Sequence, residues 1–132
     1  MQGWPIGREG ILTTYRARLG AQGESIAAAF LEARGYVVRE RNYHCRGGEI
    51  DLICAADAAI VFCEVKLRRG NAFGSPEEAV TRRKLDRLIY AAQTYLAAHG
   101  LEDADWRIDL VAIELDARGA IARTELYQGI GG

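Results

Sequence analysis

The sequence predicts an α/β domain built on a mixed central β-sheet that is flanked by helices. Two strand-like runs, at residues 48–53 and 61–66, stand close enough along the chain to form a hairpin. A long helical pattern at residues 75–99 then precedes a third strand-like run at residues 106–115. A helix between two strands makes a crossover that places them parallel, so the sheet should contain both antiparallel and parallel pairs.

The length and composition are those of one globular domain. The chain has 132 residues, of which 49% are hydrophobic and 27% are charged. We expect a single α/β domain over residues 21–132 and a flexible N-terminal arm over residues 1–20, in which residues 11–19 could also be helical. No apolar run reaches the length of a membrane span or a signal peptide, so we expect a cytoplasmic protein without a membrane partner. The odd number of cysteines, three, indicates free thiols.

The first predicted helix covers residues 21–34 and ends at Gly35. Its expected core stripe consists of Ile26, Ala29, Phe30 and Ala33. Glu24 shares another face of this helix with Ala27, Ala28 and Leu31. A glutamate at this place is usually a favourable charge near a helix N-terminus, but it would point into a site if the helix packs across the sheet.

A short strand at residues 36–41 and a loop at residues 42–48 come next. The double glycine Gly47-Gly48 would allow close approach to a ligand backbone. The hairpin follows, and a two-residue loop at Asp57-Ala58 would set its register.

The second predicted helix has a strong start signal, because Ser75 is a good N-cap, Pro76 suits the first turn and Glu78 stands at the third helical position. It should end at Gly100 and bury one stripe of residues: Leu85, Leu88, Ile89, Ala92, Tyr95 and Leu96. Before it, residues 69–74 form a polar loop that could contact substrate. After the strand at residues 106–115, a weaker strand is expected at residues 121–127.

Acidic residues inside the hairpin are the main functional signal. The predicted register places Asp51 opposite Glu64 and Glu49 opposite Lys66 on one face. The other face is apolar and consists of Ile50, Leu52, Cys54, Val61, Cys63, Val65 and Leu67. A slip of one residue would set charges against apolar groups, so the pattern itself favours this register.

Like charges that face each other across a sheet repel, so the Asp51–Glu64 pair predicts a shared proton or a divalent cation. With Lys66 on the same face, such a site could orient a water molecule and polarise a phosphodiester. The simpler alternative is a solvent-exposed hairpin with Glu49–Lys66 and Glu64–Lys66 ion pairs.

The net charge of −1 gives no sign of nucleic-acid binding, but the local distribution of charge does. A basic segment follows the acidic face and consists of Arg68, Arg69, Arg82, Arg83, Lys84 and Arg87. These residues are either a solvated helix face or contacts to phosphates that the acids alone would repel.

Several motifs together resemble one known family: Gly23-Glu24, Gly48-Glu49-Ile50-Asp51-Leu52-Ile53, Phe62-Cys63-Glu64-Val65-Lys66-Leu67-Arg68, Phe73-Gly74-Ser75-Pro76, Lys84 and Arg107-Ile108-Asp109. They resemble the bacterial family known as YraN-like (UPF0102), over roughly residues 20–127. That family is similar to archaeal Holliday-junction resolvases and belongs to the restriction-endonuclease-like superfamily. The resemblance implies that residues 21–132 form a nuclease-like domain with a restriction-endonuclease-like fold.

The resemblance also implies roles for individual residues. Asp51 and Glu64 would match the metal-binding acids, Lys66 the catalytic lysine, and Glu24 a glutamate carried by a helix. Glu49 belongs to the motif of the family itself, as a supporting residue. The implied cofactor is Mg2+ or Mn2+, the implied partner is DNA, and a homodimer would suit symmetrical cutting of two strands.

Three hypotheses follow for the function. The first is a metal-dependent DNA endonuclease that hydrolyses phosphodiester bonds, with branched or otherwise structured DNA as a candidate substrate. The second is a nucleic-acid-binding protein with a nuclease-like fold and no cleavage. The third is a structural protein whose acidic face is only a cluster of ion pairs.

Overall fold

The computed structural model describes residues 8–69 and 80–131, which form one five-stranded mixed sheet and two helices. The elements in chain order are α1 (Arg8–Ala33), β1 (Val37–Cys45), β2 (Gly48–Ala56), β3 (Ala59–Arg69), α2 (Arg82–Ala98), β4 (Trp106–Leu115) and β5 (Ile121–Tyr127). The predicted mixed α/β class is therefore confirmed. Within the described residues, no helix is both long enough and apolar enough to cross a membrane.

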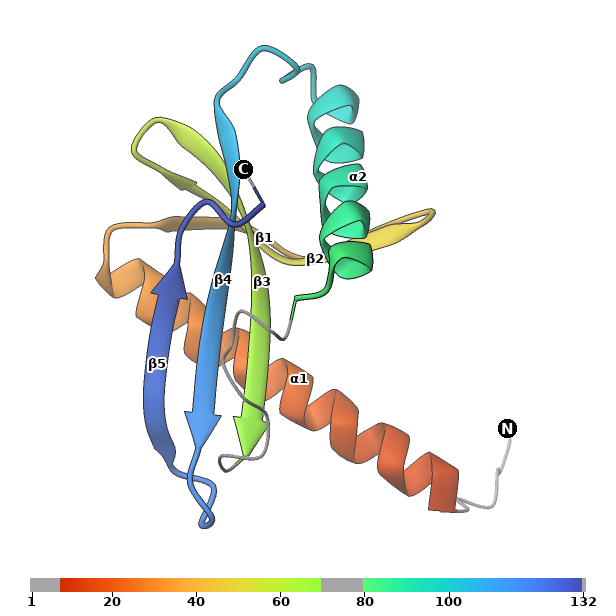
Figure 1. Cartoon of the computed structure of the whole chain (residues 1–132), viewed down its shortest axis with the longest axis vertical. Coiled ribbons are helices and arrows are strands. Elements are labelled where there is room, and N and C mark those ends of the chain that lie inside the picture. Colours follow the sequence, from red (N-terminus) through yellow and green to blue (C-terminus); the bar gives the residue numbers. More distant parts are fainter. Residues whose placement is uncertain (1–7, 70–79, 132) are drawn as a thin grey trace.

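The five strands lie side by side in the order of the chain (Figure 1). β3 pairs parallel with β4 through the α2 crossover, as predicted, and the other neighbouring pairs are antiparallel. The hairpin register is also confirmed, because Leu52 pairs with Cys63 and Ala56 with Ala59. The predicted turn residues Asp57 and Ala58 both have positive φ, 51° and 61°, which matches the twist of a two-residue hairpin loop.

The two helices cover opposite faces of the sheet, and each face has its own hydrophobic cluster. The α1 side contains Leu52, Cys54, Val61, Cys63 and Val111 from the strands. The α2 side contains Ile50, Ile53, Phe62 and Ile108 from the strands. The hairpin face that carries Phe62 is therefore covered by a helix, and Ile50 packs on that side rather than on the predicted apolar face.

The expected core stripe of α1 is only half correct. Ile26 and Phe30 are half-buried and pack against the core on the α1 side of the sheet. Ala29 and Ala33 are exposed, whereas Ala27, Ala28 and Leu31 are almost fully buried against the sheet. The face that carries Glu24 is thus the face that packs across the strands. Small side chains suit this face because α1 comes close to β3, with Gly23 against Val65 and Leu67.

Three predicted boundaries are corrected by the structure. The helix predicted at residues 21–34 begins already at Arg8, so the segment from Arg8 to Gly20 is helical. The loop predicted at residues 42–48 is largely strand, because β1 continues to Cys45 through pairing with β2. The described helix α2 begins at Arg82, where the Thr81 hydroxyl accepts a hydrogen bond of 3.2 Å from the Lys84 N–H. The predicted start signal at Ser75 and the loop at residues 70–74 lie outside the described residues.

The helix α2 buries largely the predicted stripe. Leu88, Ala92, Tyr95 and Leu96 are buried in the second cluster, and Leu85 and Ile89 pack against it. The three cysteines are free thiols, as expected.

A buried hydrogen-bond network surrounds Asp109 on β4. This carboxylate is fully buried and accepts hydrogen bonds from the Tyr36 hydroxyl (2.8 Å), the Arg107 Nε (3.1 Å) and the Gly129 N–H (3.0 Å). The Tyr36 oxygen in turn accepts from Arg107 (3.0 Å) and Gln128 (2.9 Å). This Asp109 network joins β4 to the end of α1 and to the segment after β5.

Candidate active site

The candidate active site lies where β2 separates from β3. Regular pairing of these strands ends at Leu52 opposite Cys63. At the residue before Leu52, the Asp51 Oδ2 accepts a hydrogen bond of 2.8 Å from the backbone N–H of Val65. In a continued ladder, the Val65 N–H would donate to a backbone carbonyl of β2. Here it donates to the Asp51 carboxylate instead. Asp51 is fixed in place by this bond, and its strand leaves room beside it.

Asp51 and Glu64 form a close pair of acids at this point. The two side chains are close enough for Glu64 to raise the pKa of Asp51, and Glu64 is only 3% exposed. Burial, reinforced by the negative charge of Glu64, raises the pKa of Asp51 to about 7, against an opposing contribution from the Val65 hydrogen bond. The predicted juxtaposition of the two acids is therefore present, with Glu64 buried and Asp51 half-buried.

Two lysines approach the same carboxylate. The Nζ of Lys66 on β3 lies 3.3 Å from the Glu64 Oε2, and the Nζ of Lys84 on α2 lies 3.5 Å from that same oxygen. The Glu64–Lys66 ion pair of the simpler hypothesis is thus present, but it is not a solvent-exposed pair, because Glu64 is buried. Lys84 was expected only as a phosphate contact, and the structure places it beside the acids.

Glu24 reaches the site from α1. A cavity of about 260 Å³ between α1 and the strands is lined by Glu24, Asp51, Lys66 and their neighbours. Burial raises the pKa of Glu24, whereas a hydrogen bond with Asn42 works in the opposite direction. Of the two alternatives for Glu24, a charge near a helix N-terminus or a side chain that points into the site, the structure shows the second.

Asn42 is a residue that the sequence analysis missed. Its neighbours Arg41 and Tyr43 pair with Leu52 and Ile50, so Asn42 lies beside Asp51 on the adjacent strand. Its φ of 53° lies in the left-handed region, which asparagine tolerates better than most residues. The signal in the sequence is a polar residue, Asn42, that interrupts an otherwise extended run. The loop predicted at residues 42–48 includes this residue and so hides the signal.

Glu49 does not lie opposite Lys66, so this part of the predicted register is wrong. The described ladder between β2 and β3 does not reach these positions, because the part of β2 before Leu52 diverges from β3. Glu49 is exposed and forms an ion pair of 3.3 Å with His44 on β1. Its charge still contributes to the raised pKa of Glu24, so it lies near the edge of the site.

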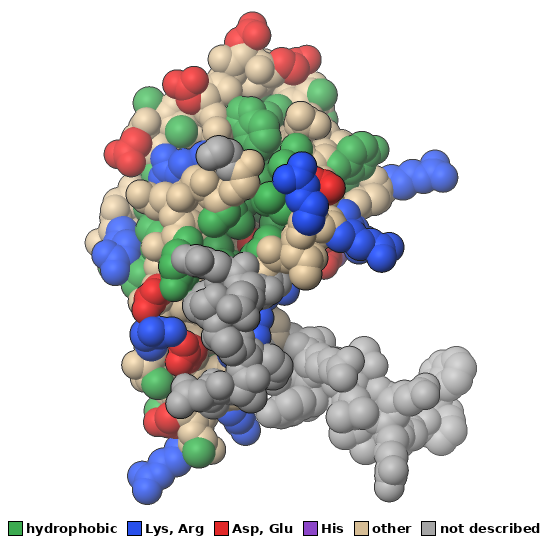
Figure 2. Space-filling view, in the orientation of Figure 1, with side chains coloured by type: hydrophobic (Ala, Val, Ile, Leu, Met, Phe, Trp, Pro, Cys, Tyr) green, Lys and Arg blue, Asp and Glu red, His purple; other side chains and the backbone are tan. Residues whose placement is uncertain are grey.

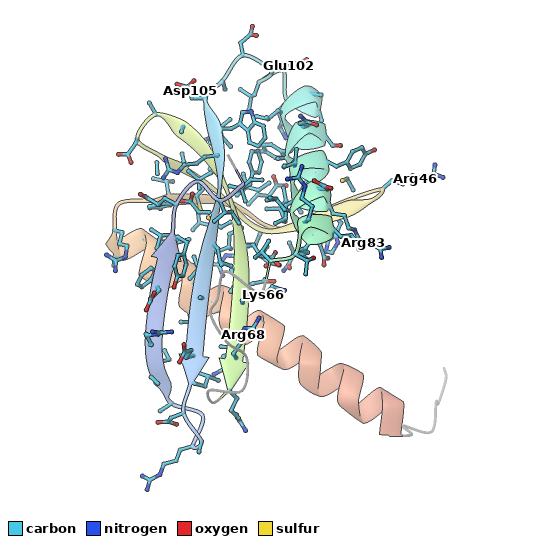
Figure 3. The ribbon with its side chains drawn as sticks, viewed as in Figure 1. Arg46, Lys66, Arg68, Arg83, Glu102 and Asp105 are labelled. Atoms are coloured by element: carbon cyan, nitrogen blue, oxygen red, sulfur yellow. The ribbon has the colours of Figure 1, made fainter. Side chains whose placement is uncertain are left out.

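The predicted DNA-contacting residues fall into four places. Lys84 joins the acids, and Arg68 shares the face of β3 that carries Lys66, as Figure 3 shows. Arg69 lies at the end of the sheet, near Gly119 in the β4–β5 turn. Arg82, Arg83 and Arg87 line a separate groove beside the β1–β2 hairpin.

Charge is segregated along the molecule, although the net charge is only −1. Arg46 and Arg83 extend on one side, beside the first turn of α2 and the hairpin tip (Figure 3). Glu102 and Asp105 lie beyond the opposite end of α2, about 25 Å away along a helix of 17 residues. Figure 2 shows acidic side chains at the top of this view and basic side chains at its right, whereas the lower left carries both kinds. A polyanion would thus be attracted to the end where the candidate site lies.

The donor set at the site fits a hard divalent cation. Asp51 and Glu64 supply carboxylate oxygens, the ligands that Mg2+ prefers, and a cation would relieve the repulsion that raises the Asp51 pKa. Within the described residues, however, no group of three or more acidic, histidine or cysteine side chains is arranged as a complete metal centre. A cation held by these two acids would need water or substrate oxygens to fill its coordination.

Fold and site together define a mixed α/β protein with a carboxylate pair, of which Glu64 is buried and Asp51 half-buried, and two lysines at a strand separation. The chain belongs to the uncharacterised protein family UPF0102, whose family model matches residues 23–113. This match includes every acid and lysine of the candidate site.

Full-length relatives support the same assignment. The chain is 47% identical over 113 residues to a UPF0102 protein of Beutenbergia cavernae, which covers 86% of this chain and 95% of the relative. It is 43% identical over 118 residues to a UPF0102 protein of Moorella thermoacetica, which covers 89% of this chain and 98% of the relative. The predicted family is therefore confirmed.

Proposed function

We propose that the protein is a metal-dependent DNA endonuclease with a restriction-endonuclease-like fold. The observation that carries this proposal is the Asp51–Glu64 pair, with Glu64 buried and Asp51 half-buried, held beside Lys66 at the point where two strands separate. Buried like charges are costly and persist where they serve a purpose that a neutral pair would not serve. Mg2+ or Mn2+ binding and phosphodiester hydrolysis are the chemistry that this donor set fits best.

The side chains would divide the work as follows. Asp51 and Glu64 would hold the cation, which would supply Lewis-acid chemistry at the phosphate. The Val65 N–H fixes the Asp51 carboxylate, so the ligand is oriented before substrate arrives. The Lys66 ammonium, 3.3 Å from Glu64, is placed to orient a water molecule or to stabilise charge on the phosphate oxygens.

Lys84 and Glu24 complete the surroundings of this site. Lys84 balances the charge of Glu64 from its position on α2. Glu24, with its raised pKa, is a candidate third acid that could accept a proton from water. Branched or structured DNA is the proposed substrate, and a homodimer would allow two strands to be cut symmetrically.

The direct test is a cleavage assay on linear, single-stranded, flap and four-way-junction DNA, with Mg2+, Mn2+ or EDTA. Wild type should cleave at least one substrate in the presence of metal. Lys66→Ala, Asp51→Asn and Glu64→Gln should each lower the rate by at least about 100-fold, because each removes a group that acts on the transition state. Arg118→Ala, on the exposed β4–β5 turn, is the matched control and should retain the full rate.

Binding measured alongside cleavage separates the two leading hypotheses. Lys66→Ala should bind DNA nearly as well as wild type, since one lysine among many cations contributes little to affinity. Full cleavage by Lys66→Ala would contradict the proposed mechanism. Tight binding by wild type without cleavage of any substrate would favour the second hypothesis, a nucleic-acid-binding protein with a nuclease-like fold.

A further inference from the structure

A basic groove with an exposed aromatic ring lies beside the candidate active site. It has a volume of about 730 Å³ between the tip of the β1–β2 hairpin and α2. Arginine dominates its lining: Arg46 comes from the hairpin, and Arg82, Arg83 and Arg87 come from α2. The ring is that of Tyr90, whose side chain is 52% exposed.

The hairpin is packed tightly on α2, so the groove is preformed. A Cβ atom added to Gly48 would lie 2.8 Å from the Arg87 carbonyl oxygen, and one added to Gly47 would lie 3.2 Å from the Tyr90 ring. The backbone of the hairpin thus lies close to α2 at both glycines. The double glycine was expected to admit a ligand backbone, and the structure shows instead that it admits α2. A preformed groove loses little entropy when a ligand binds.

The charge of the groove suits a polyanion. Among the lining residues that the structure describes, Asp86 is the only acid, and it is paired with Arg82 at 3.2 Å on the helix surface. Arg46, Arg83 and Arg87 leave the groove strongly positive. Figure 3 shows Arg46 and Arg83 extending on the same side of the molecule, from the hairpin tip and from α2.

The spacing along α2 suits a strand of nucleotides. Arg83, Arg87 and Tyr90 recur at the helical period and share one face of α2. They span roughly 10 Å, the length of about three stacked nucleotides. Lys84 follows Arg83 directly and reaches Glu64, so a strand bound along this face would lead toward the acids.

Tyr90 distinguishes an unpaired strand from a duplex. An exposed aromatic ring can stack on a base only where the base has left its own stack, whereas arginines alone would be enough for the backbone of a duplex. We propose that this groove binds a single-stranded segment of DNA, with Tyr90 stacking on an unpaired base and the arginines holding the flanking phosphates. The inference rests on the proposed nuclease function and specifies its substrate as DNA that contains an unpaired segment next to the cut.

Binding is measured in EDTA, so that the result does not depend on cleavage. The probe is a fluorescent oligothymidylate of about 12 nucleotides, compared with a duplex of the same length. Tyr90→Leu should weaken binding of the oligothymidylate about 5- to 150-fold, because stacking contributes about 1–3 kcal/mol per base. Tyr90→Phe should retain the affinity of wild type, and neither change should affect duplex binding by more than about twofold.

The arginines are tested by salt dependence. Arg46→Ala should flatten the dependence of log affinity on log salt by about 0.7 for a single strand. Arg118→Ala is the matched control on a distant turn and should leave the slope unchanged. Thermal melting of each variant establishes that it is folded. We expect every variant to fold, because the substituted positions are exposed.

The outcomes separate this inference from the proposed function. Oligothymidylate binding by Tyr90→Leu at the affinity of wild type would overturn the groove, even if the protein cleaves DNA. Equal losses for oligothymidylate and duplex would overturn it as well, because stacking on an unpaired base would then have no part. A change of oligomeric state in Tyr90→Leu, with unchanged DNA binding, would assign the groove to contact with a second copy of the chain. Selective loss of oligothymidylate binding in a protein that cuts nothing would support the groove and contradict the nuclease.

Discussion

Two clusters of side chains, one around Asp109 and one around Asp51 and Glu64, lie on neighbouring parts of the same sheet. Their acidic groups have opposite kinds of surroundings. The Asp109 carboxylate is surrounded by donors, from Arg107, Tyr36 and the Gly129 N–H. Asp51 has one backbone donor and faces another carboxylate, Glu64. The two clusters are also close in space. Asp109 on β4 pairs with Cys63 on β3, and Cys63 directly precedes Glu64.

The difference indicates what each cluster is for. A buried charge with a full set of partners holds elements together, here β4, the end of α1 and the segment after β5. A buried acid that faces a second acid has a poorly satisfied charge, which a cation or a proton would satisfy. The Asp109 network thus stabilises the fold, whereas the Asp51–Glu64 pair has stability to gain from a ligand.

The largest expected effect is a difference in stability between two alanine substitutions. At about pH 8, Asp109→Ala should lower the free energy of unfolding by about 3–5 kcal/mol, because it leaves the Arg107 charge buried without its partner. Asp51→Ala should be close to neutral or stabilising, because it removes a repulsion. Urea unfolding followed by circular dichroism measures both. Equal losses in the two variants would mean that the acids have the same structural role.

The pH dependence of stability should show the second largest effect. The pKa of Asp51 is about 7 in the folded protein against an ordinary 3.8, so the folded protein retains a proton that the unfolded chain has lost. The resulting stabilisation is complete below about pH 4 and disappears as the pH rises to about 7, with a total on the order of a few kcal/mol. Unfolding experiments across this range should show the decline in wild type and a much flatter profile in Asp51→Asn. Parallel profiles would contradict the raised pKa.

Metal binding should have a somewhat smaller effect. At about 100 times the dissociation constant, Mg2+ or Mn2+ should stabilise wild type by about 2.7 kcal/mol, because only the folded protein holds the acids together. Thermal melting at about pH 8 should show this shift in wild type and in Asp109→Asn, and lose it in Asp51→Asn and Glu64→Gln. A midpoint of wild type that ignores both metals at millimolar concentrations would count against the site.

The smallest expected effect sharpens the structural side of the comparison. Tyr36→Phe removes the hydroxyl that donates to Asp109 and accepts from Arg107 and Gln128. We expect a loss of about 1 kcal/mol in the free energy of unfolding, since Arg107 and the Gly129 N–H still satisfy Asp109. Cleavage and metal-dependent stabilisation should be unchanged. A loss of either would show that the two clusters do not act independently.

The sequence was most informative where a pattern repeats over short distances. Alternation of polar and apolar residues and the two-residue turn at Asp57-Ala58 gave the hairpin register, which the pairing of Leu52 with Cys63 confirms. The parallel pairing of β3 with β4 was also predictable, because a helix that connects two neighbouring strands places them parallel. These features depend on local geometry.

The face of α1 could not be chosen from the sequence in the same way. The helix offers one stripe with Ile26 and Phe30 and another with Ala27, Ala28 and Leu31, and larger side chains made the first stripe look like the core. The structure buries the second, because close approach of α1 to β3 at Gly23 favours small residues. Glu24 was placed at the site by this packing.

By itself, the sequence determined the class of fold, the pairing of the hairpin, and the position of two acids and a lysine on neighbouring strands. Tertiary structure alone decided that β2 is separated from β3 before Leu52, that Glu49 turns to His44, and that Lys84 and Asn42 join the acids. The physical reason is that strand alternation is set by each residue's own backbone. Burial, charge repulsion and raised pKa values depend on groups brought together from α1, α2 and three strands, and no local pattern records their distances.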